Sequence, residues 1–207
     1  MDQQTTMYIA VGGLAGFVVL VLVIALLVRS WSKKRVKAWH DTAAAHGLTG
    51  TGTWPLMEMR GALDGISVGL RHRREINYQR TDDSDDNRTK YDSWCEAYAS
   101  IPGGLGDAQI AEEGLFAKLS KLVGATDIET GDPKFDKRFM VKSAHPAATK
   151  ARLGPTVRDS LVRLEAALRG QITVENSEVR WKGGSASHER AIEILKHLAV
   201  TARSFSD

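Results

Sequence analysis

The sequence has one cysteine, Cys95, among its 207 residues, so no disulfide can form within the chain. That usage is typical of proteins kept in a reducing compartment. The net charge is only +3, which is too small to indicate a nucleic-acid-binding protein. The sequence also lacks the GxxxxGK[ST] loop that binds nucleotide phosphates. These absences argue against a nucleic-acid-binding protein and against a nucleotide-binding protein of that loop type. The fold class must be inferred from the features that are present.

Charge is missing altogether from one stretch near the N-terminus. Residues 8–28 read YIAVGGLAGFVVLVLVIALLV, which is 21 residues without a charged side chain. A helix rises about 1.5 Å per residue, so this length matches a hydrocarbon core of about 30 Å. A buried helix of a soluble protein normally keeps a polar stripe. The sequence therefore predicts a transmembrane helix over 8–28, after a short tail of residues 1–7.

Basic residues follow this span and none precedes it. The residues before the span carry one acid, Asp2, whereas a cleaved signal peptide would begin with a positive region. Basic residues mark the cytoplasmic end of a span. The sequence therefore predicts a retained single-pass anchor in the plasma or inner membrane, with the C-terminal domain in the cytoplasm. The basic collar of the juxtamembrane segment 29–38 is also expected to attract anionic lipid; it consists of Arg29, Lys33, Lys34, Arg35 and Lys37.

The span contains two glycines at GxxxG spacing, Gly12 and Gly16. This spacing lets two membrane helices approach closely, but glycine is also common in single membrane helices. The expected partner is the lipid bilayer. Another protein, or a second copy of the chain joined at these glycines, is a further candidate.

Residues 39–207 predict a soluble α+β domain with a mostly antiparallel sheet, because strands and helices are mixed without strict alternation. Two positions indicate tight hairpin turns, Asp64-Gly65 and Asn176-Ser177. Glycine-rich residues 47–55 are interpreted as a connector. Division into two lobes, 39–124 and 125–207, is an open alternative. Beyond the two hairpins, the patterns predict helices at 36–46, 115–124, 146–153, 155–169 and 187–205, and strands at 91–101 and 138–143.

The stretch TGDPKFDKRFMV, residues 130–141, contains two acids that invite a catalytic interpretation. Asp132 before Pro133 is typical of a helix start, where the carboxylate caps free N–H groups. Phe135 and Phe139 are then expected as core anchors. Asp136 stands among Lys134, Lys137 and Arg138, so the sequence predicts that it is ion-paired and ionised, unlike a general acid.

This stretch also carries a resemblance. The motif tGDxxFDxxFxV, followed by an L…VRxxLxxL helix, resembles a widespread family of uncharacterised bacterial proteins, whose GxxxGxxV hairpin matches MRGALDGISVGL at residues 59–70. The resemblance covers most of residues 39–203. It implies a coherent domain and a bacterial source, and it implies no reaction.

Two functional hypotheses follow from the sequence. The first is a non-enzymatic interaction or scaffolding domain at the membrane. The second is an enzyme with an unrecognised carboxylate site, which predicts that several of four acids, Asp92, Glu96, Asp132 or Asp136, converge in one concave pocket. No metal or cofactor is expected, because the six histidines lack the close spacing of a helical metal site and one cysteine cannot supply a thiolate cluster.

Overall fold

The computed structural model describes residues 3–78, 89–112 and 126–206. Its nine strands form one antiparallel sheet in the order β1-β2-β3-β4-β9-β8-β5-β7-β6. The predicted α+β class with an antiparallel sheet is therefore confirmed. The strands are β1 Thr49–Thr53, β2 Leu56–Leu63, β3 Ile66–Tyr78, β4 Thr89–Ser100, β5 Gln109–Glu112, β6 Thr126–Asp127, β7 Phe139–Ser143, β8 Gln171–Glu175 and β9 Glu178–Gly184.

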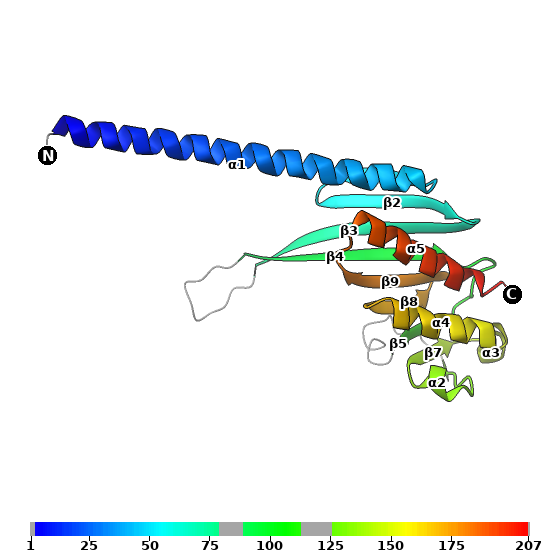
Figure 1. The fold of residues 1–207 in the computed structure, drawn as a ribbon. Helices are drawn as coiled ribbons and strands as arrows, with labels where there is room; N and C mark the ends of the chain where they lie inside the picture. Colours follow the sequence, from blue (N-terminus) through cyan, green and yellow to red (C-terminus); the bar gives the residue numbers. More distant parts are fainter. Residues whose placement is uncertain (1–2, 79–88, 113–125, 207) are drawn as a thin grey trace, which may run out of the picture.

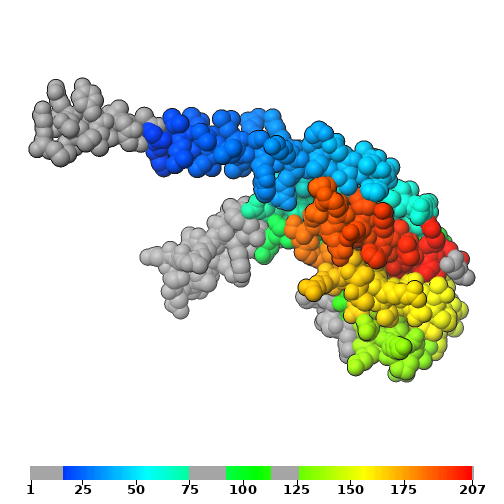
Figure 2. Space-filling view, in the orientation of Figure 1, coloured from blue at the N-terminus to red at the C-terminus, as the bar shows by residue number. Residues whose placement is uncertain are grey.

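The helices gather on one face of this sheet (Figures 1 and 2). Helix α5 packs across β3, β4 and β9, with α4 on one side of it and the C-terminal part of α1 on the other. Buried apolar side chains from these helices and from the sheet form one hydrophobic core. The helices are α1 Gln3–Ala45, α2 Pro133–Asp136, α3 Pro146–Arg152, α4 Pro155–Ala167 and α5 His188–Arg203.

The predicted apolar span and the predicted helix at 36–46 are parts of one continuous helix, α1. Its first part projects away from the domain (Figure 1), and the large apolar side chains from Phe17 to Val28 are exposed. Its last turns dock on the sheet through Trp39 and Ala43, which are buried. By length and composition the helix can cross a membrane. No break separates the projecting part from the docked part, so the apolar stretch is joined to the domain by continuous helix.

The end of α1 and both predicted hairpin turns are confirmed. Gly47 adopts a φ of +69° just after α1, as expected for a helix stop. Asp64 (φ 48°) and Gly65 (φ 83°) connect β2 to β3, and Asn176 (φ 51°) and Ser177 (φ 60°) connect β8 to β9. Positive φ at both central residues is the geometry of the tight turn that suits twisted strands.

The interpretation of residues 47–55 as a connector was wrong, because they contain β1. Its sequence TGTGT has no apolar alternation, but the strand pairs in register with β2 from Thr49 opposite Arg60 to Thr53 opposite Leu56. Gly50 permits this placement, since a Cβ there would lie 3.0 Å from the backbone of His40 on α1. The strand is therefore positioned by the docked helix more than by its own pattern.

Strands from the two halves of the chain share the sheet. The β8–β9 hairpin lies between β4 and β5, so strands from 125–207 are hydrogen-bonded to strands from 39–124 on both sides. β5 and the two-residue β6 were not predicted. The helix predicted at 115–124 lies outside the described residues.

Candidate binding face

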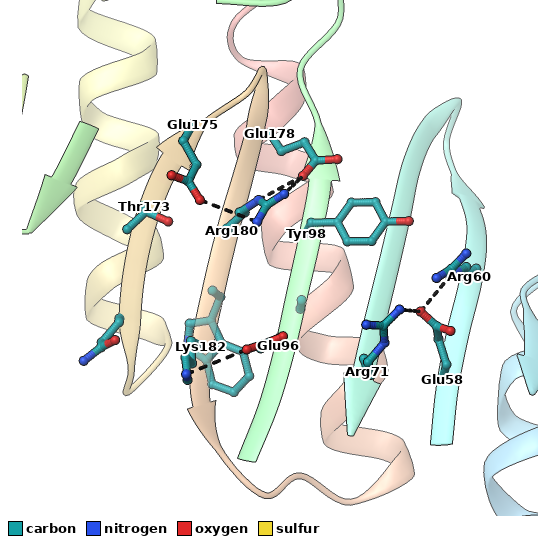
Figure 3. A pocket seen from close by; sticks show the side chains of 13 residues that line it. Glu58, Arg60, Arg71, Glu96, Tyr98, Thr173, Glu175, Glu178, Arg180 and Lys182 are labelled. Carbon is teal, nitrogen blue, oxygen red and sulfur yellow. Dashed lines mark hydrogen bonds and ion pairs between the residues drawn. The ribbon is translucent and has the colours of Figure 1, made fainter. Parts of the chain in front are cut away.

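The face of the sheet opposite the helices carries polar side chains in the described strands at its centre. Along β2, Met57 and Met59 point into the core while Glu58 and Arg60 point outward. The same alternation runs through β3, β4, β9 and β8, so their outward residues lie side by side (Figure 3). They line a shallow depression of about 530 Å³. We call this surface the open face, with Glu58, Arg60, Arg71, Glu96, Tyr98, Thr173, Glu175, Glu178, Arg180 and Lys182 as its principal residues.

Ion pairs organise the β2–β3–β4 part of the open face. One oxygen of Glu58 accepts from Arg60 Nε at 2.7 Å and from Arg71 Nη2 at 3.3 Å. Glu96 lies 3.7 Å from Lys182 Nζ on β9 and 3.9 Å from Arg73 Nε on β3. Each carboxylate therefore connects cations from neighbouring strands.

A second cluster lies on the β8–β9 hairpin. Arg180 Nη2 is 2.8 Å from Glu178, and Arg180 Nη1 is 3.5 Å from Glu175 on β8. All of these side chains remain partly exposed, so each pair contributes little to stability. The pairs instead hold the guanidinium groups in fixed directions on the surface.

Tyr98 lies between the two clusters (Figure 3). Its ring covers Gly69 on the adjacent strand, where an added Cβ would stand 2.4 Å from the ring. Only glycine leaves room for the ring to lie flat on the strand at that position. The open face thus has an aromatic centre surrounded by charged groups.

The charges lining the depression balance. Four cations, Arg60, Arg71, Arg180 and Lys182, face four carboxylates, Glu58, Glu96, Glu175 and Glu178. The depression therefore presents as many carboxylates as cations.

The four acids of the enzyme hypothesis do not converge. Glu96 lies on the open face and Asp92 is exposed near the start of the same strand, β4. Asp132 and Asp136 belong to the α2 region, which packs beside β7 and α4. β4 and β7 are four strand positions apart in the sheet, which is about 19 Å at about 4.8 Å per step. The described residues therefore offer no joint acid/base site for these four groups.

The motif at 130–141 has the predicted structural role, with one correction. Asp132 caps α2, since its carboxylate accepts from the N–H groups of Lys134 and Phe135. Phe135 is fully buried and stacks on Phe139 with ring centres 5.1 Å apart. Asp132 also lies 3.4 Å from Arg158 Nε on α4.

The correction concerns Asp136, which was predicted to pair with its basic neighbours. Its carboxylate instead accepts hydrogen bonds from the Thr130 hydroxyl at 2.7 Å and from the backbone N–H groups of Thr130 and Gly131. Arg138 pairs with Glu165 on α4. The loop curls back over α2, so backbone donors reach the carboxylate that the lysines were expected to neutralise. Burial opposes its ionised form, but these hydrogen bonds outweigh burial and hold the pKa of Asp136 below its ordinary value.

We expect Asp136→Asn to lower the free energy of unfolding by about 2 kcal/mol at pH 7, since hydrogen bonds to a charged group are lost. A carboxyl with a lowered pKa stabilises the fold above its ordinary pKa of about 4, and this contribution disappears as the pH falls through the folded-state pKa. The difference from the unaltered chain should therefore shrink at pH 3. Urea unfolding of the detergent-solubilised protein at both pH values measures this. Asp159→Asn, at an exposed position on α4, is the matched control and should change little.

His72 and Cys95 lie opposite one another on β3 and β4, inside the core. A cysteine beside a histidine can be a nucleophile, but this pair is closed off. Burial raises the pKa of Cys95 to about 11, so the thiol stays protonated. The ring nitrogens of His72 lie 2.8 Å from the Pro55 carbonyl and 2.9 Å from the Ser185 hydroxyl. Both side chains therefore serve as packing groups of the sheet and are not available as a nucleophile and its base.

Residues 65–69 read GISVG, which matches the GxSxG spelling of a hydrolase nucleophile turn. That turn must connect a strand to a helix. Here the five residues pass from a hairpin turn into β3, and Ser67 is an exposed strand residue. The sequence match therefore lacks the strand-to-helix geometry that the catalytic turn requires. In the described part of the chain, no group of three or more His, Cys, Asp or Glu side chains is placed to hold a metal ion.

The basic collar, predicted to face lipid, and the two glycines, predicted as a helix–helix contact, all lie on α1. Gly12 and Gly16 belong to its projecting part, and a Cβ at Gly16 would meet open space. Of the basic collar, Lys37 pairs with Asp41 one turn along the helix, and Arg35 stacks between two tryptophans. The collar is thus partly joined to the domain. Its other members are Arg29, Lys33 and Lys34.

The open face itself was missed from the sequence. Its signal was present as the polar half of each alternating strand, such as Glu58 and Arg60 between methionines. The alternation does not show the strand order, which places β9 beside β4 and β8 beside β9. The structure divides the basic run RHRR at 71–74, since Arg71 and Arg73 face carboxylates on the open face and His72 is buried.

No protein-family model and no curated protein matches the sequence. Among solved structures, the chain is similar to the crystal structure of the mycobacterial trehalose monomycolate transport factor A, TtfA, with a TM-score of 0.49 and 12% sequence identity. The match covers 82% of this chain and 91% of that chain. So distant a likeness carries no argument about function. The resemblance to uncharacterised bacterial proteins stays a prediction.

Proposed function

We propose that this protein is a single-pass, membrane-anchored interaction protein whose domain binds another protein through the open face. Its apolar helix spans the bilayer and its domain lies in the cytoplasm. The uncharged stretch at 8–28 supports the span, and the basic collar after it supports the orientation.

The open face is the observation that carries the proposal. An antiparallel sheet can leave one face to water, so exposure alone would mean little. Here the exposed face is hollowed, with Tyr98 at its centre and three arginines held by carboxylates around it. Tyrosine and arginine are enriched at protein interfaces, and a partly apolar centre with a polar rim is typical of them. The balanced charge favours a protein surface over a polyanion.

Site-specific photo-crosslinking in membranes tests this proposal. A photoreactive residue at Thr173, on the open face, is expected to give a discrete crosslinked product in cells that express the full-length chain. The same residue at Lys196, exposed on α5, is expected to give none. Arg180→Glu should abolish the Thr173 product, because it places a third acid beside Glu175 and Glu178.

The control for Arg180→Glu is Arg163→Glu, at an exposed position on α4, which should leave the product intact. Equal crosslinking from Thr173 and Lys196, or no product from Thr173, would contradict the proposal. The alternative of a carboxylate enzyme gains no support from the positions of Asp92, Glu96, Asp132 and Asp136. Self-association through Gly12 and Gly16 stays a prediction.

A further inference from the structure

A second hollow, shallow and open to solvent, lies where α1 meets the turn between β1 and β2. Its volume is about 440 Å³. One wall is a single face of α1, because the lining positions recur three or four residues apart; the other wall is the turn. We call it the collar cavity, and it is lined by Ser32, Lys33, Val36, Lys37, His40, Asp41, Thr53 and Trp54.

The turn side of the collar cavity is held in place. The guanidinium of Arg35 lies 4.8 Å from the ring centre of Trp31 and 4.3 Å from that of Trp54. Trp54 also contacts the ring of His72, with centres 5.0 Å apart, and His72 is hydrogen-bonded to the Pro55 carbonyl. The Trp54 side chain is therefore held in place before a ligand binds, which lowers the entropic cost of binding.

The polar groups of the collar cavity suit an anion. Two lysines and one aspartate line it, and Lys37 is paired with Asp41. Within the described part of the chain no carboxylate pairs with Lys33, which is exposed. Ser32 and Thr53, whose hydroxyls can donate hydrogen bonds, line the same cavity. A cation with neighbouring hydroxyl donors is the chemistry that binds a phosphate group.

The position along α1 places the Ser32–Lys33 end of this cavity at lipid headgroups. The apolar stretch ends at Val28, and Lys33 lies five residues further, about 8 Å at about 1.5 Å per residue. The headgroup layer on each side of a hydrocarbon core is about 5–8 Å thick. Lys33 and Ser32 therefore lie at the depth of lipid phosphates when 8–28 spans the bilayer.

Exposed apolar side chains mark the same end of the domain. Trp31 is 62% exposed and Leu56, two residues after Trp54, is 59% exposed. Tryptophan prefers the membrane interface. Leaving such groups in water is unfavourable, whereas a nearby bilayer would cover them.

We propose that the collar cavity binds the phosphodiester headgroup of an anionic lipid, with Lys33 as its cation and Trp54 as its fixed wall. The inference rests on the proposed function, because the domain must lie against the bilayer. The proposal goes beyond a general attraction of anionic lipid to the basic collar, because it assigns the lipid phosphate to one site. It also distinguishes Lys33 from Lys34, an exposed lysine on the same turn that does not line the cavity.

Native mass spectrometry of the full-length protein in non-ionic detergent, titrated with phosphatidylglycerol and with phosphatidylcholine, tests the assignment. We expect one saturable phosphatidylglycerol site and much weaker binding of phosphatidylcholine. Lys33→Gln should weaken the site about tenfold, since it removes one charge-assisted hydrogen bond. Lys34→Gln removes the same charge one residue away and should stay within about twofold of the unaltered chain.

An equal loss of phosphatidylglycerol affinity in Lys33→Gln and Lys34→Gln would indicate general electrostatic attraction to the collar and would overturn the proposal. Equal affinity of the unaltered chain for the two lipids would also overturn it. Displacement of bound phosphatidylglycerol by millimolar inorganic phosphate would assign the cavity to a free anion and would also overturn it. Because the titration is done in detergent, it does not depend on insertion. Release of the unaltered chain from membranes by alkaline carbonate would contradict the proposed membrane anchor. It would not change the result of the lipid titration, so failure of the two proposals can be told apart.

Discussion

A chain carrying Val18→Arg and Val21→Arg should appear in the soluble fraction after alkaline carbonate treatment, whereas the unaltered chain stays with the membrane pellet. Both valines lie near the middle of the uncharged span and are about half exposed on α1. An arginine at the centre of a membrane helix costs about 2.5–3.5 kcal/mol, so the pair shifts insertion by about 5–7 kcal/mol. That is more than a thousandfold in the partition between membrane and water, because 1.4 kcal/mol is about tenfold. Immunoblotting of the two fractions measures it.

The matched control is Val18→Leu with Val21→Leu, which keeps the span apolar and should remain in the pellet. The intact mass of the unaltered chain adds a second check. A retained anchor keeps residues 8–28, whereas a cleaved signal sequence would leave a chain beginning after Val28. Recovery of that shortened chain would contradict the anchor. Digestion of the domain by protease added to intact cells would contradict the cytoplasmic orientation.

Phe135→Ala should destabilise the domain by about 3–5 kcal/mol, the usual cost of emptying a fully buried aromatic position. The Phe135 side chain has no exposure and stacks on Phe139 of β7. Loss of the ring therefore removes both apolar burial and an aromatic pair. Across a domain of this size we expect the thermal midpoint to fall by about 10 °C. Thermal unfolding of the detergent-solubilised chain, followed by circular dichroism, measures the change.

Phe135→Leu is the control, because it keeps most of the buried volume and should cost less than half as much. Amide hydrogen exchange adds spatial information, since exchange in β5 and β7 should accelerate before exchange in β3 and β4. An unchanged midpoint in Phe135→Ala would mean that α2 does not contribute to the core. The motif would then need another explanation.

The elements closest to correct prediction were those specified by local chemistry. Asp64-Gly65 and Asn176-Ser177 define their hairpins because the turns need residues that tolerate positive φ. Asp132 caps α2, and Ser187 caps α5 by accepting from Arg190 N–H. These interactions span at most three residues, so a pattern in the sequence contains both partners.

The failures involve contacts that no pattern in the sequence specifies, whether the partners are near or distant along the chain. β1 has no strand pattern of its own and is positioned between β2 and α1. Asp136 was assigned to adjacent lysines, but the loop at 130–131 presents N–H groups to it, and neighbours in sequence cannot reveal that curl. The open face needed β4 beside β9, a pairing that joins Trp94 to Gly184.

By itself the sequence determined an apolar helix long enough for a bilayer, the basic residues after it, the turns, the caps and the alternation of the strands other than β1, β5 and β6. Only the tertiary structure decided which strands are neighbours, and therefore which outward side chains form one surface. It also decided that α1 runs unbroken into the domain and closes a cavity against the β1–β2 turn. The physical reason is range: caps, turns and periodicity act within a few residues, whereas strand order and helix docking follow from burying apolar faces supplied by the whole chain.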